Sequence, residues 1–322
     1  MAELPFNQEL VNWLRDNRTD SLTVIFKFFT FLGSEMGYIL IVLGIYWLYN
    51  KNLALRLTMV VIVTSALNQL IKVIIKNPRP YVSNDTYKEN WAISENEIEE
   101  TATSYSTPSG HAMGSASFWT FIHYKIQSPK TKILAIVMII LIGLSRPYLG
   151  VHYFEDVIIG WVLGLLVVYI ILKYEKTIVE KWESVSQRTG IVAIIIVAFF
   201  VMIIGGITTS FGTDGVIYAT LSGLITGLIV GYNIETNKVG FIAETKSVVN
   251  GVLRFLIGII LSLGVLLGLK SVFAEIAKDE SEIGYILRFI RYATLGIVAT
   301  VLTGKIFLSL GLADTHFQIK EN

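Results

Sequence analysis

The sequence predicts an all-α membrane protein, a polytopic helical bundle with about nine spans. First, 53% of the 322 residues are hydrophobic, and the mean hydropathy is +0.61. Second, only 16% of the residues are charged, against roughly 25% in soluble domains. Third, apolar runs near the roughly 20 residues that a spanning helix needs alternate with charged breaks. This composition excludes a disordered chain and almost any soluble enzyme.

Nine apolar runs have the length, or nearly the length, of a spanning helix. The first is long, and we expect it either to bend near residues 33–37 or to begin as an interfacial helix that a span follows. The third is short, and its first turn is polar. In chain order the runs are Leu22–Tyr49, Leu53–Ile75, His111–Lys125, Ile133–Leu149, Tyr153–Leu172, Gly190–Thr209, Gly215–Tyr232, Val249–Leu269 and Leu287–Leu308.

The first 20 residues are polar and precede the spans. They contain no small-residue cleavage site of the kind that ends a secretory signal. Trp13 and Leu14 are typical of an amphipathic segment on the membrane surface, and an ordered cap on the bundle explains them equally well. We therefore predict an N-terminal interfacial segment over residues 1–20.

One connection between the runs is long, Asn77–Thr107, and it is acidic over residues 85–100. A loop of this length among short ones is usually functional or disordered. A solvated surface is the simpler explanation of its acidic residues.

The distribution of Lys and Arg predicts the orientation, because cytoplasmic loops of membrane proteins carry an excess of both. With nine spans, 14 of these residues fall on one face and nine on the other, leaving out Lys72, Arg79 and Arg146. The richer face is then cytoplasmic. The N-terminus and the acidic loop lie outside, and the C-terminus lies inside.

Three groups of polar residues lie at the ends of predicted spans. Charged residues at membrane depth are costly, which makes them candidates for function. Helix parity places all three groups at the same membrane face. The groups are Lys72–Pro80, Pro108–His111 and Ser145–Asp156.

Five of these residues suit a phosphate group. Arg79 and Arg146 each offer a planar fork that matches phosphate oxygens, and Lys72 offers a point charge. Ser109 and Gly110 begin a predicted helix, whose N-terminus presents free N–H groups and the positive end of a dipole. Together they predict a site for a tetrahedral phosphate with two or more negative charges.

Three further residues in these groups suit acid–base and nucleophilic chemistry. His152 and Asp156 are four residues apart, so on a helix they share a face. A carboxylate beside an imidazole fixes its tautomer, which leaves the other ring nitrogen as a nucleophile or base. His111 can protonate a leaving oxygen. Taken singly, these features also have structural explanations, such as a helix cap or an Arg146–Asp156 ion pair, and their convergence favours a catalytic site.

No residue pattern in the sequence indicates a metal or cofactor site. With no Cys in the chain, a thiol nucleophile and a Cys-based metal site are excluded. The net charge of +1 indicates no nucleic-acid partner.

The three groups together resemble the signature of the type 2 phosphatidic acid phosphatase superfamily. The matching elements are Lys72 six residues before Arg79-Pro80, then Pro108–His111, and then Ser145-Arg146 followed by His152 and Asp156. The resemblance implies a metal-independent membrane phosphatase with a six-helix-type core, working through a phosphohistidine. The resemblance covers roughly residues 37–173. We therefore predict a catalytic bundle over residues 21–175 and additional spans of unknown role over 176–322.

The resemblance also implies a role for each matching residue. His152 is the expected nucleophile, Asp156 its orienting partner and His111 the general acid. Five residues are expected to bind phosphate: Lys72, Arg79, Ser109, Gly110 and Arg146. Lys76 lies outside the signature and is interpreted as a helix-end anchor.

The second half of the chain lacks a comparable charged group. Its clearest feature is glycine at every fourth position, Gly223 to Gly231 and again Gly264 to Gly268, a spacing that lets helices approach closely. Packing within the chain and a homodimer interface are the two interpretations. Three charged residues could also contact a substrate head group: Asp214, Arg288 and Arg291.

The predicted function is hydrolysis of a lipid phosphomonoester or diphosphate, with a lipid phosphate and membrane lipids as partners. The alternatives are a phosphatase for a soluble sugar phosphate, a lipid phosphotransferase, a vanadate haloperoxidase and, from another class, a lipid transporter or scramblase. We expect the plasma membrane as the location, with the active site on the extracytoplasmic face.

Overall fold

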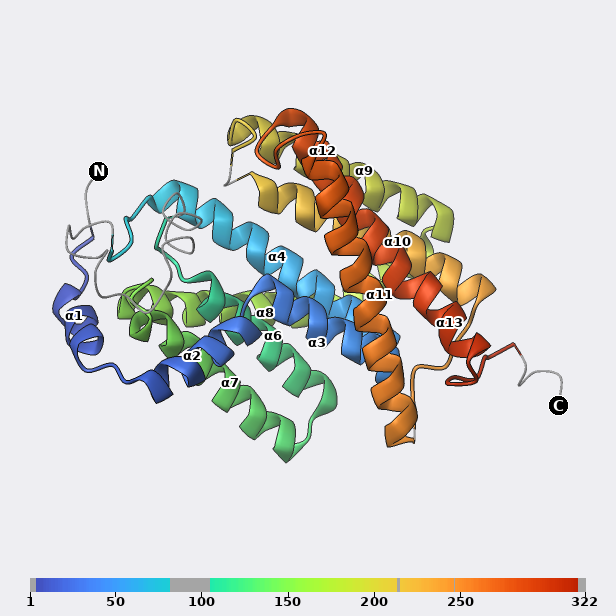
Figure 1. The fold of residues 1–322 in the computed structure, drawn as a ribbon, viewed down its shortest axis with the longest axis horizontal. Helices are drawn as coiled ribbons and strands as arrows, with labels where there is room; N and C mark the ends of the chain where they lie inside the picture. Colours follow the sequence, from blue (N-terminus) through green and yellow to red (C-terminus); the bar gives the residue numbers. More distant parts are fainter. Residues whose placement is uncertain (1–3, 82–104, 213–214, 246, 318–322) are drawn as a thin grey trace. The chain divides into compact units, whose positions relative to one another are not determined.

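The computed structural model describes residues 4–81, 105–212, 215–245 and 247–317, and in these ranges the regular secondary structure is helical (Figure 1). The acidic stretch 85–100 and Asp214 lie outside the described residues. An isolated bridge joins Phe241 to Thr315. In chain order the helices are α1 (Gln8–Asp16), α2 (Asp20–Leu32), α3 (Glu35–Leu48), α4 (Lys51–Ile75), α6 (Gly110–Ile126), α7 (Pro129–Tyr148), α8 (Phe154–Ser184), α9 (Gln187–Thr208), α10 (Val216–Lys238), α11 (Val248–Ala274), α12 (Glu282–Ile297), the π-helix η2 (Val298–Leu302) and α13 (Thr303–Ser309).

Seven helical segments of the described chain are long and apolar enough to cross a membrane, or eight if α2 and α3 form one bent span. The bend of 61° between α2 and α3 confirms the break expected near residues 33–37. The one predicted span missing from this set is the third run, His111–Lys125, which forms α6, a helix of 17 residues. Such a helix rises only about 26 Å, less than the roughly 30 Å of a bilayer core.

The chain folds as two compact units. The first comprises residues 1–39 and 59–176, and the second comprises 40–58 and 177–322. The three predicted polar groups all belong to the first unit. The turn between α3 and α4 belongs to the second unit, although the sequence places it among the spans of the catalytic bundle.

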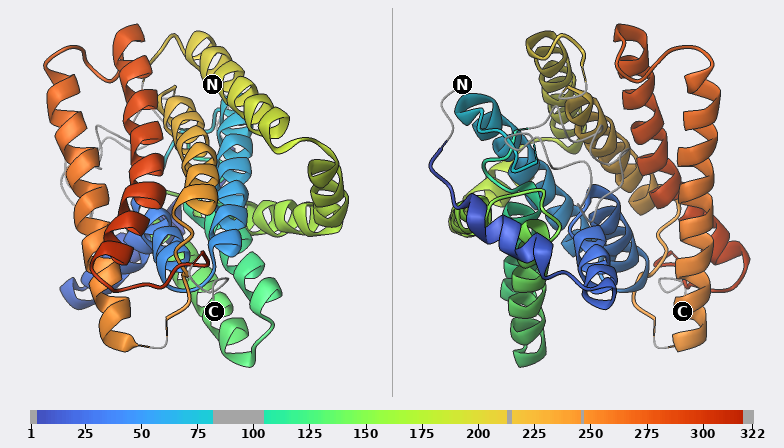
Figure 2. Two further views of the ribbon diagram at one scale, coloured as in Figure 1. Left: turned by 90° about the vertical axis from the view of Figure 1, so that its right-hand side faces the viewer. Right: turned by 60° about the vertical axis from the view of Figure 1, so that its left-hand side comes forward.

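In the first unit, α6 and α7 form an antiparallel hairpin, against which α2 also packs (Figures 1 and 2). The other side of α6 meets α8 at two glycines. A Cβ on Gly164 would lie 2.3 Å from the Met113 carbonyl oxygen, and one on Gly160 would lie 2.8 Å from that of Ser109. These glycines therefore let the first turn of α6 approach the first turns of α8.

The N-terminal segment is an ordered cap on this unit. The Leu4 N–H donates to the Asn77 side chain at 3.1 Å, and the Asn7 N–H donates to Glu155 at 3.0 Å. In α1, Val11 is buried while Trp13 is 60% exposed. The two expectations for this segment are thus compatible, because an ordered cap presents an aromatic side chain at its surface.

In the second unit, α10 packs along α12 through the first glycine series. A Cβ on Gly227 would lie 2.0 Å from the Ala293 carbonyl oxygen, and one on Gly223 would lie 2.3 Å from that of Phe289. This series is therefore used for packing within the chain. Around Gly264 and Gly268, by contrast, no atom of the described residues lies within 4 Å of an added Cβ.

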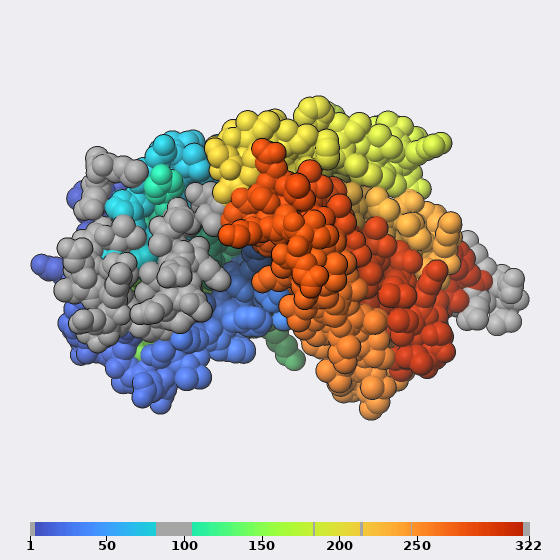
Figure 3. Space-filling view, turned by 45° about the horizontal axis from the view of Figure 1, so that its top comes forward, coloured from blue at the N-terminus to red at the C-terminus, as the bar shows by residue number. Residues whose placement is uncertain are grey.

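Residues 40–58 are built into the core of the second unit by buried polar contacts. The Trp47 indole donates to the Ala299 carbonyl at 2.8 Å, and Lys51 pairs with the buried Glu235 at 2.8 Å. On the outside of this unit, α9 (yellow-green) and α11 (orange) lie at the surface in Figure 3. Many of their large apolar side chains are exposed, as expected of helices that face lipid.

Candidate active site

The three predicted cations are buried in the first unit. Lys72 lies in the last turn of α4, Arg79 just beyond α4, and Arg146 in the last turn of α7. Between the first two, Lys76 has a left-handed backbone with φ of 55°. Lys76 therefore ends α4 in a turn, and the chain beyond it leads to Arg79.

His152 and Asp156 lie together at the start of α8. The His152 Nδ1 is 3.3 Å from the Asp156 Oδ2, and the two side chains are 2% and 0% exposed. His152 precedes the first residue of α8, so the pair does not share a helix face as the spacing suggested. The Tyr153 N–H also donates to the Asp156 Oδ2 at 2.9 Å, which fixes the carboxylate in the first turn of α8.

Two hydroxyl groups that the sequence analysis did not single out complete the surroundings of Asp156. Ser106 donates to the Asp156 Oδ2 through a short hydrogen bond and lies 3.3 Å from the His152 Nδ1. Thr107 donates to the Asp156 Oδ1 at 2.5 Å. Their position directly before Pro108 is the only sequence signal that could have pointed to them. Ser106 thus bridges the carboxylate and the imidazole.

Arg79 determines which nitrogen of His152 carries the proton. Its Nη1 donates to the Val151 carbonyl at 3.0 Å and lies 3.3 Å from the His152 Nε2. Because a guanidinium only donates, the Nε2 must accept, and the proton then sits on Nδ1 toward Ser106 and Asp156. Burial lowers the pKa of His152 well below 6.5, and the charges of Arg79, Lys72 and Arg146 lower it further. The imidazole is therefore neutral, with a lone pair on the nitrogen that faces the cations.

The start of α6 is bonded to the backbone of Asp156. The Ser109 N–H donates to the Asp156 backbone oxygen at 3.1 Å, and the Ser109 side chain caps the helix by accepting from the Ala112 N–H. A Cβ on Gly110 would lie 3.1 Å from the Asn68 Oδ1 of α4. The backbone of this turn is therefore held between α4 and α8.

His111 belongs to the same cluster. The positive charges of Arg146, Lys72 and Arg79 act on His111 as they do on His152. The two imidazoles and the three cations therefore lie close enough to interact electrostatically. All eight residues that the sequence nominated lie in the first unit, and all the nominated side chains except His111 are buried below a tenth of their surface.

Arg288 and Arg291, nominated as contacts for a head group, belong to the second unit. Both bind Asp279, at 2.8 and 3.1 Å. Among the described residues, no group of three or more His, Cys, Asp or Glu is arranged to hold a metal ion.

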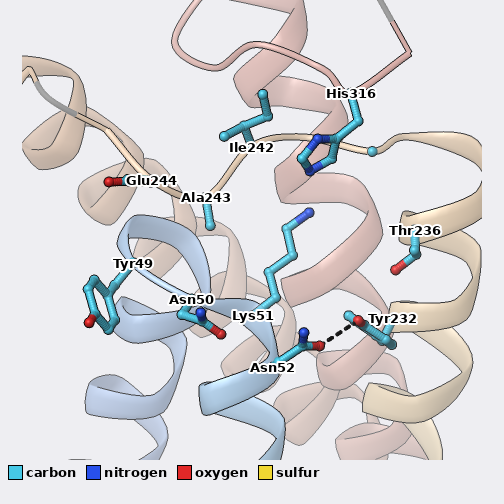
Figure 4. Close-up of a pocket in the computed structure, with 11 residues that line it drawn as sticks. Tyr49, Asn50, Lys51, Asn52, Tyr232, Thr236, Ile242, Ala243, Glu244 and His316 are labelled. Atoms are coloured by element: carbon cyan, nitrogen blue, oxygen red, sulfur yellow. Dashed lines mark hydrogen bonds between the residues drawn. The ribbon is translucent and has the colours of Figure 1, made fainter. Parts of the chain in front are cut away.

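A separate cavity of about 300 Å³ lies in the second unit (Figure 4). Lys51 and His316 line it, together with the amide side chains of Asn50 and Asn52. The Tyr232 hydroxyl donates to the Asn52 amide oxygen at 2.8 Å. None of the nominated residues lines this cavity, so the candidate site and the cavity are distinct.

A helical membrane fold that gathers buried cations, two imidazoles and a helix N-terminus in one place is that of an integral-membrane phosphatase. The model of the PAP2 superfamily matches residues 53–180, and that of the PAP2 superfamily phosphatase, transmembrane extension, matches residues 219–315. Together these two models match more than half of the chain. The chain therefore belongs to the PAP2 superfamily.

Known proteins show how far the similarity extends. An undecaprenyl-diphosphatase of Sulfolobus acidocaldarius is 29% identical over 53% of this chain and 80% of its own length. The sphingosine-1-phosphate phosphatase 2 of Mus musculus is 27% identical over 89% of this chain and 88% of its own length. Among solved structures, LpxE of Aquifex aeolicus covers 52% of this chain and 95% of its own, with 24% identity and a TM-score of 0.45.

Proposed function

We propose that this phosphatase hydrolyses the phosphate ester or diphosphate of a lipid, without a metal, through a phosphohistidine on His152. The observation that carries the proposal is the state of His152. Its Nδ1 is held by Ser106 and Asp156, and its Nε2 faces Arg79. This neutral tautomer keeps a lone pair on Nε2, and that lone pair attacks once the Arg79 guanidinium moves its hydrogen bond from Nε2 to the bound phosphate.

In the first step, the His152 Nε2 attacks phosphorus and a P–N bond forms. The P–O bond to the lipid alcohol or phosphate breaks. His111, which becomes protonated once the bound anionic phosphate offsets the neighbouring cations, gives its proton to the departing oxygen. In the second step, His111 takes a proton from a water molecule, whose oxygen attacks phosphorus. The P–N bond then breaks, inorganic phosphate leaves, and His152 returns to its neutral state.

The charges of the cradle act on the phosphoryl group during both steps. Lys72, Arg79 and Arg146 bring three positive charges, and the first turn of α6 brings N–H groups at the positive end of its dipole. Phosphoryl transfer depends mainly on such positioning and charge stabilisation. Gly110 contributes its backbone N–H to this cradle. The Ser109 N–H is already bonded to the Asp156 backbone carbonyl, so Ser109 contributes through its hydroxyl group.

A lipid with a sphingoid-type phosphate is the first substrate to test. The mouse sphingosine-1-phosphate phosphatase aligns with 89% of this chain, across both halves, whereas the archaeal diphosphatase aligns with about half. The similarity to the sphingosine-1-phosphate phosphatase therefore includes the transmembrane extension, which favours a substrate of the same kind. A diphosphate substrate is the second candidate, favoured by the archaeal relative.

The location and the assembly are further parts of the proposal. The excess of Lys and Arg on one predicted face supports an active site on the extracytoplasmic side of the plasma membrane. A homodimer would use Gly264 and Gly268, because the other glycine series packs against α12.

The test is phosphate release by purified protein in detergent and in liposomes, with chelator present throughout. The panel contains sphingoid phosphate, phosphatidic acid, phosphatidylglycerol phosphate, polyprenyl diphosphate and glucose 6-phosphate. We expect a lipid to be turned over fastest and His152→Ala to release no phosphate while remaining folded. Phosphate release by His152→Ala would contradict the mechanism. Preference for glucose 6-phosphate, transfer to an added alcohol lipid, or lipid flipping by that variant would favour the alternative functions.

A further inference from the structure

Thr30, in the last turns of α2, contacts a residue of the candidate site. The family model begins at residue 53, so α2 lies outside the matched region. The Arg146 Nη1 donates to the Thr30 Oγ1 at 2.7 Å. A helix that the family signature does not include thus holds one of the three cations.

The direction of each hydrogen bond around Thr30 is determined. The Ser145 hydroxyl donates its only proton to the Ile142 carbonyl at 2.7 Å. It must therefore accept from Thr30, whose oxygen lies 2.7 Å away. Thr30 in turn accepts from Arg146. The chain of donors runs from Arg146 through Thr30 and Ser145 to the backbone of α7, so the Thr30 lone pair is aimed at the guanidinium.

A second contact brings the same end of α2 against the site. A Cβ on Gly33 would lie 2.4 Å from the Ile142 Cγ2 and 3.2 Å from the His111 Cδ2. Gly33 lies three residues after Thr30, so both positions occupy one side of the helix. Close packing at Gly33 therefore fixes how far Thr30 stands from Arg146.

We propose that Thr30 is a positioning residue that holds the Arg146 guanidinium in the orientation required to bind the transferred phosphoryl group. The inference rests on the proposed function, since it assigns Arg146 to the phosphate. A neutral hydroxyl suits this task because it accepts a hydrogen bond without neutralising the positive charge. An acidic residue in its place would compete with the phosphate for the guanidinium.

The test uses the full-length protein and the fastest substrate of the panel, with orthovanadate as a mimic of the transferred group. Thr30→Val keeps the shape of the side chain and removes the hydroxyl, and Thr30→Ala removes it without adding bulk. We expect kcat/KM to fall about 10- to 100-fold in both, because a hydrogen bond to a charged group is lost. The inhibition constant for orthovanadate should rise by a similar factor, and Thr30→Ser should restore both values to within about threefold.

Two controls separate positioning from loss of structure. Thr58→Val removes a buried threonine hydroxyl of α4 that donates within its own helix, to the Ala54 carbonyl, and it should leave the activity unchanged. In an Arg146→Ala background, Thr30→Val should add less than about a threefold loss, because the two residues act through one interaction.

The inference is overturned if Thr30→Val and Thr30→Ala keep wild-type activity, if Thr30→Ser is no better than Thr30→Val, or if the loss is the same with and without Arg146. An active His152→Ala variant would instead contradict the proposed function. An inactive His152→Ala variant beside a fully active Thr30→Val variant would contradict only the role of Thr30.

Discussion

At the scale of single residues, the geometry of the site centres on the hydroxyl groups around Asp156. Ser106 donates to Asp156 and lies beside His152, while Thr107 donates to the other carboxylate oxygen. A carboxylate with two hydroxyl donors and a backbone donor is held in one orientation. In the proposed mechanism, the imidazole that it orients is aligned before the substrate binds, which lowers the cost of reaching the transition state.

We predict that Ser106→Ala lowers kcat about tenfold and changes KM much less. The substitution removes a hydrogen bond that orients the imidazole but no group of the phosphate cradle. Steady-state kinetics with the fastest panel substrate measures both constants. Ser115→Ala is the matched control, because that buried hydroxyl of α6 donates within its own helix, to the Ala112 carbonyl. Equal losses in the two variants would show a packing effect and no specific role for Ser106.

From the sequence we could name eight candidate residues and predict that they lie near one another. This was possible because the spacing within each group is local and each group lies at a helix end. The sequence could not predict Ser106 or Thr30 as partners. A serine before a proline and a threonine in an apolar helix are common, and their contacts depend on how α2, α7 and α8 pack. Asn68, which donates to the Pro108 carbonyl at 3.1 Å, was missed for the same reason.

At the scale of helices, the contact between α6 and α8 positions the N-terminus of α6 beside His152 and Asp156, the proposed catalytic pair. Gly160 and Gly164 are one turn apart on α8 and face the first turns of α6. Glycines at this spacing bring two backbones close together. The short α6, which is enclosed by its neighbours, can thus present its N-terminal N–H groups inside the bundle.

We predict that Gly164→Ala destabilises the protein by about 1–3 kcal/mol and lowers phosphate release. The added Cβ would lie 2.3 Å from the Met113 carbonyl oxygen, a backbone atom that moves only if α6 moves. Apparent melting temperature and activity test the prediction. Gly251→Ala is the control, because its added Cβ meets no atom closer than 3.6 Å. Wild-type stability and activity in Gly164→Ala would mean that α6 is not held by this contact.

The sequence pattern predicted the helices and the bend between α2 and α3 well, because apolar runs and charged breaks define them. It gave less information on how the helices pair. The glycine series of α10 stood out by its regular spacing, yet the pair on α8 lies closer to the chemistry and was not recognised. Spacing alone does not tell which glycines meet a neighbouring backbone.

At the scale of the whole molecule, the composition predicted a membrane protein with a catalytic part and a second set of spans. It did not predict that residues 40–58 join the second unit. Trp47, fully buried, bonds to Ala299, and Lys51 bonds to Glu235. These pairs join positions more than 180 residues apart, and no local pattern reveals such contacts.

We predict that a chain ending at residue 176 does not form a monodisperse, active protein. It would leave Trp47 without its packing partners and Lys51 without Glu235, so the apolar surface of residues 40–58 would be exposed. Size-exclusion chromatography and phosphate release measure the outcome. Co-expression of residues 177–322 as a separate chain should restore both properties. A truncated protein with wild-type activity and a single sharp elution peak would contradict the prediction.

Residues 40–58 belong to a different unit from the residues before and after them, and this limits how such a protein can evolve. The chain passes between the two units three times, after residues 39, 58 and 176. The transmembrane extension is therefore not a module that could be appended or lost at a single junction. A family member without it must fill the space around the α3–α4 turn with other side chains, so the sequence of that turn should differ between long and short relatives more than the signature does.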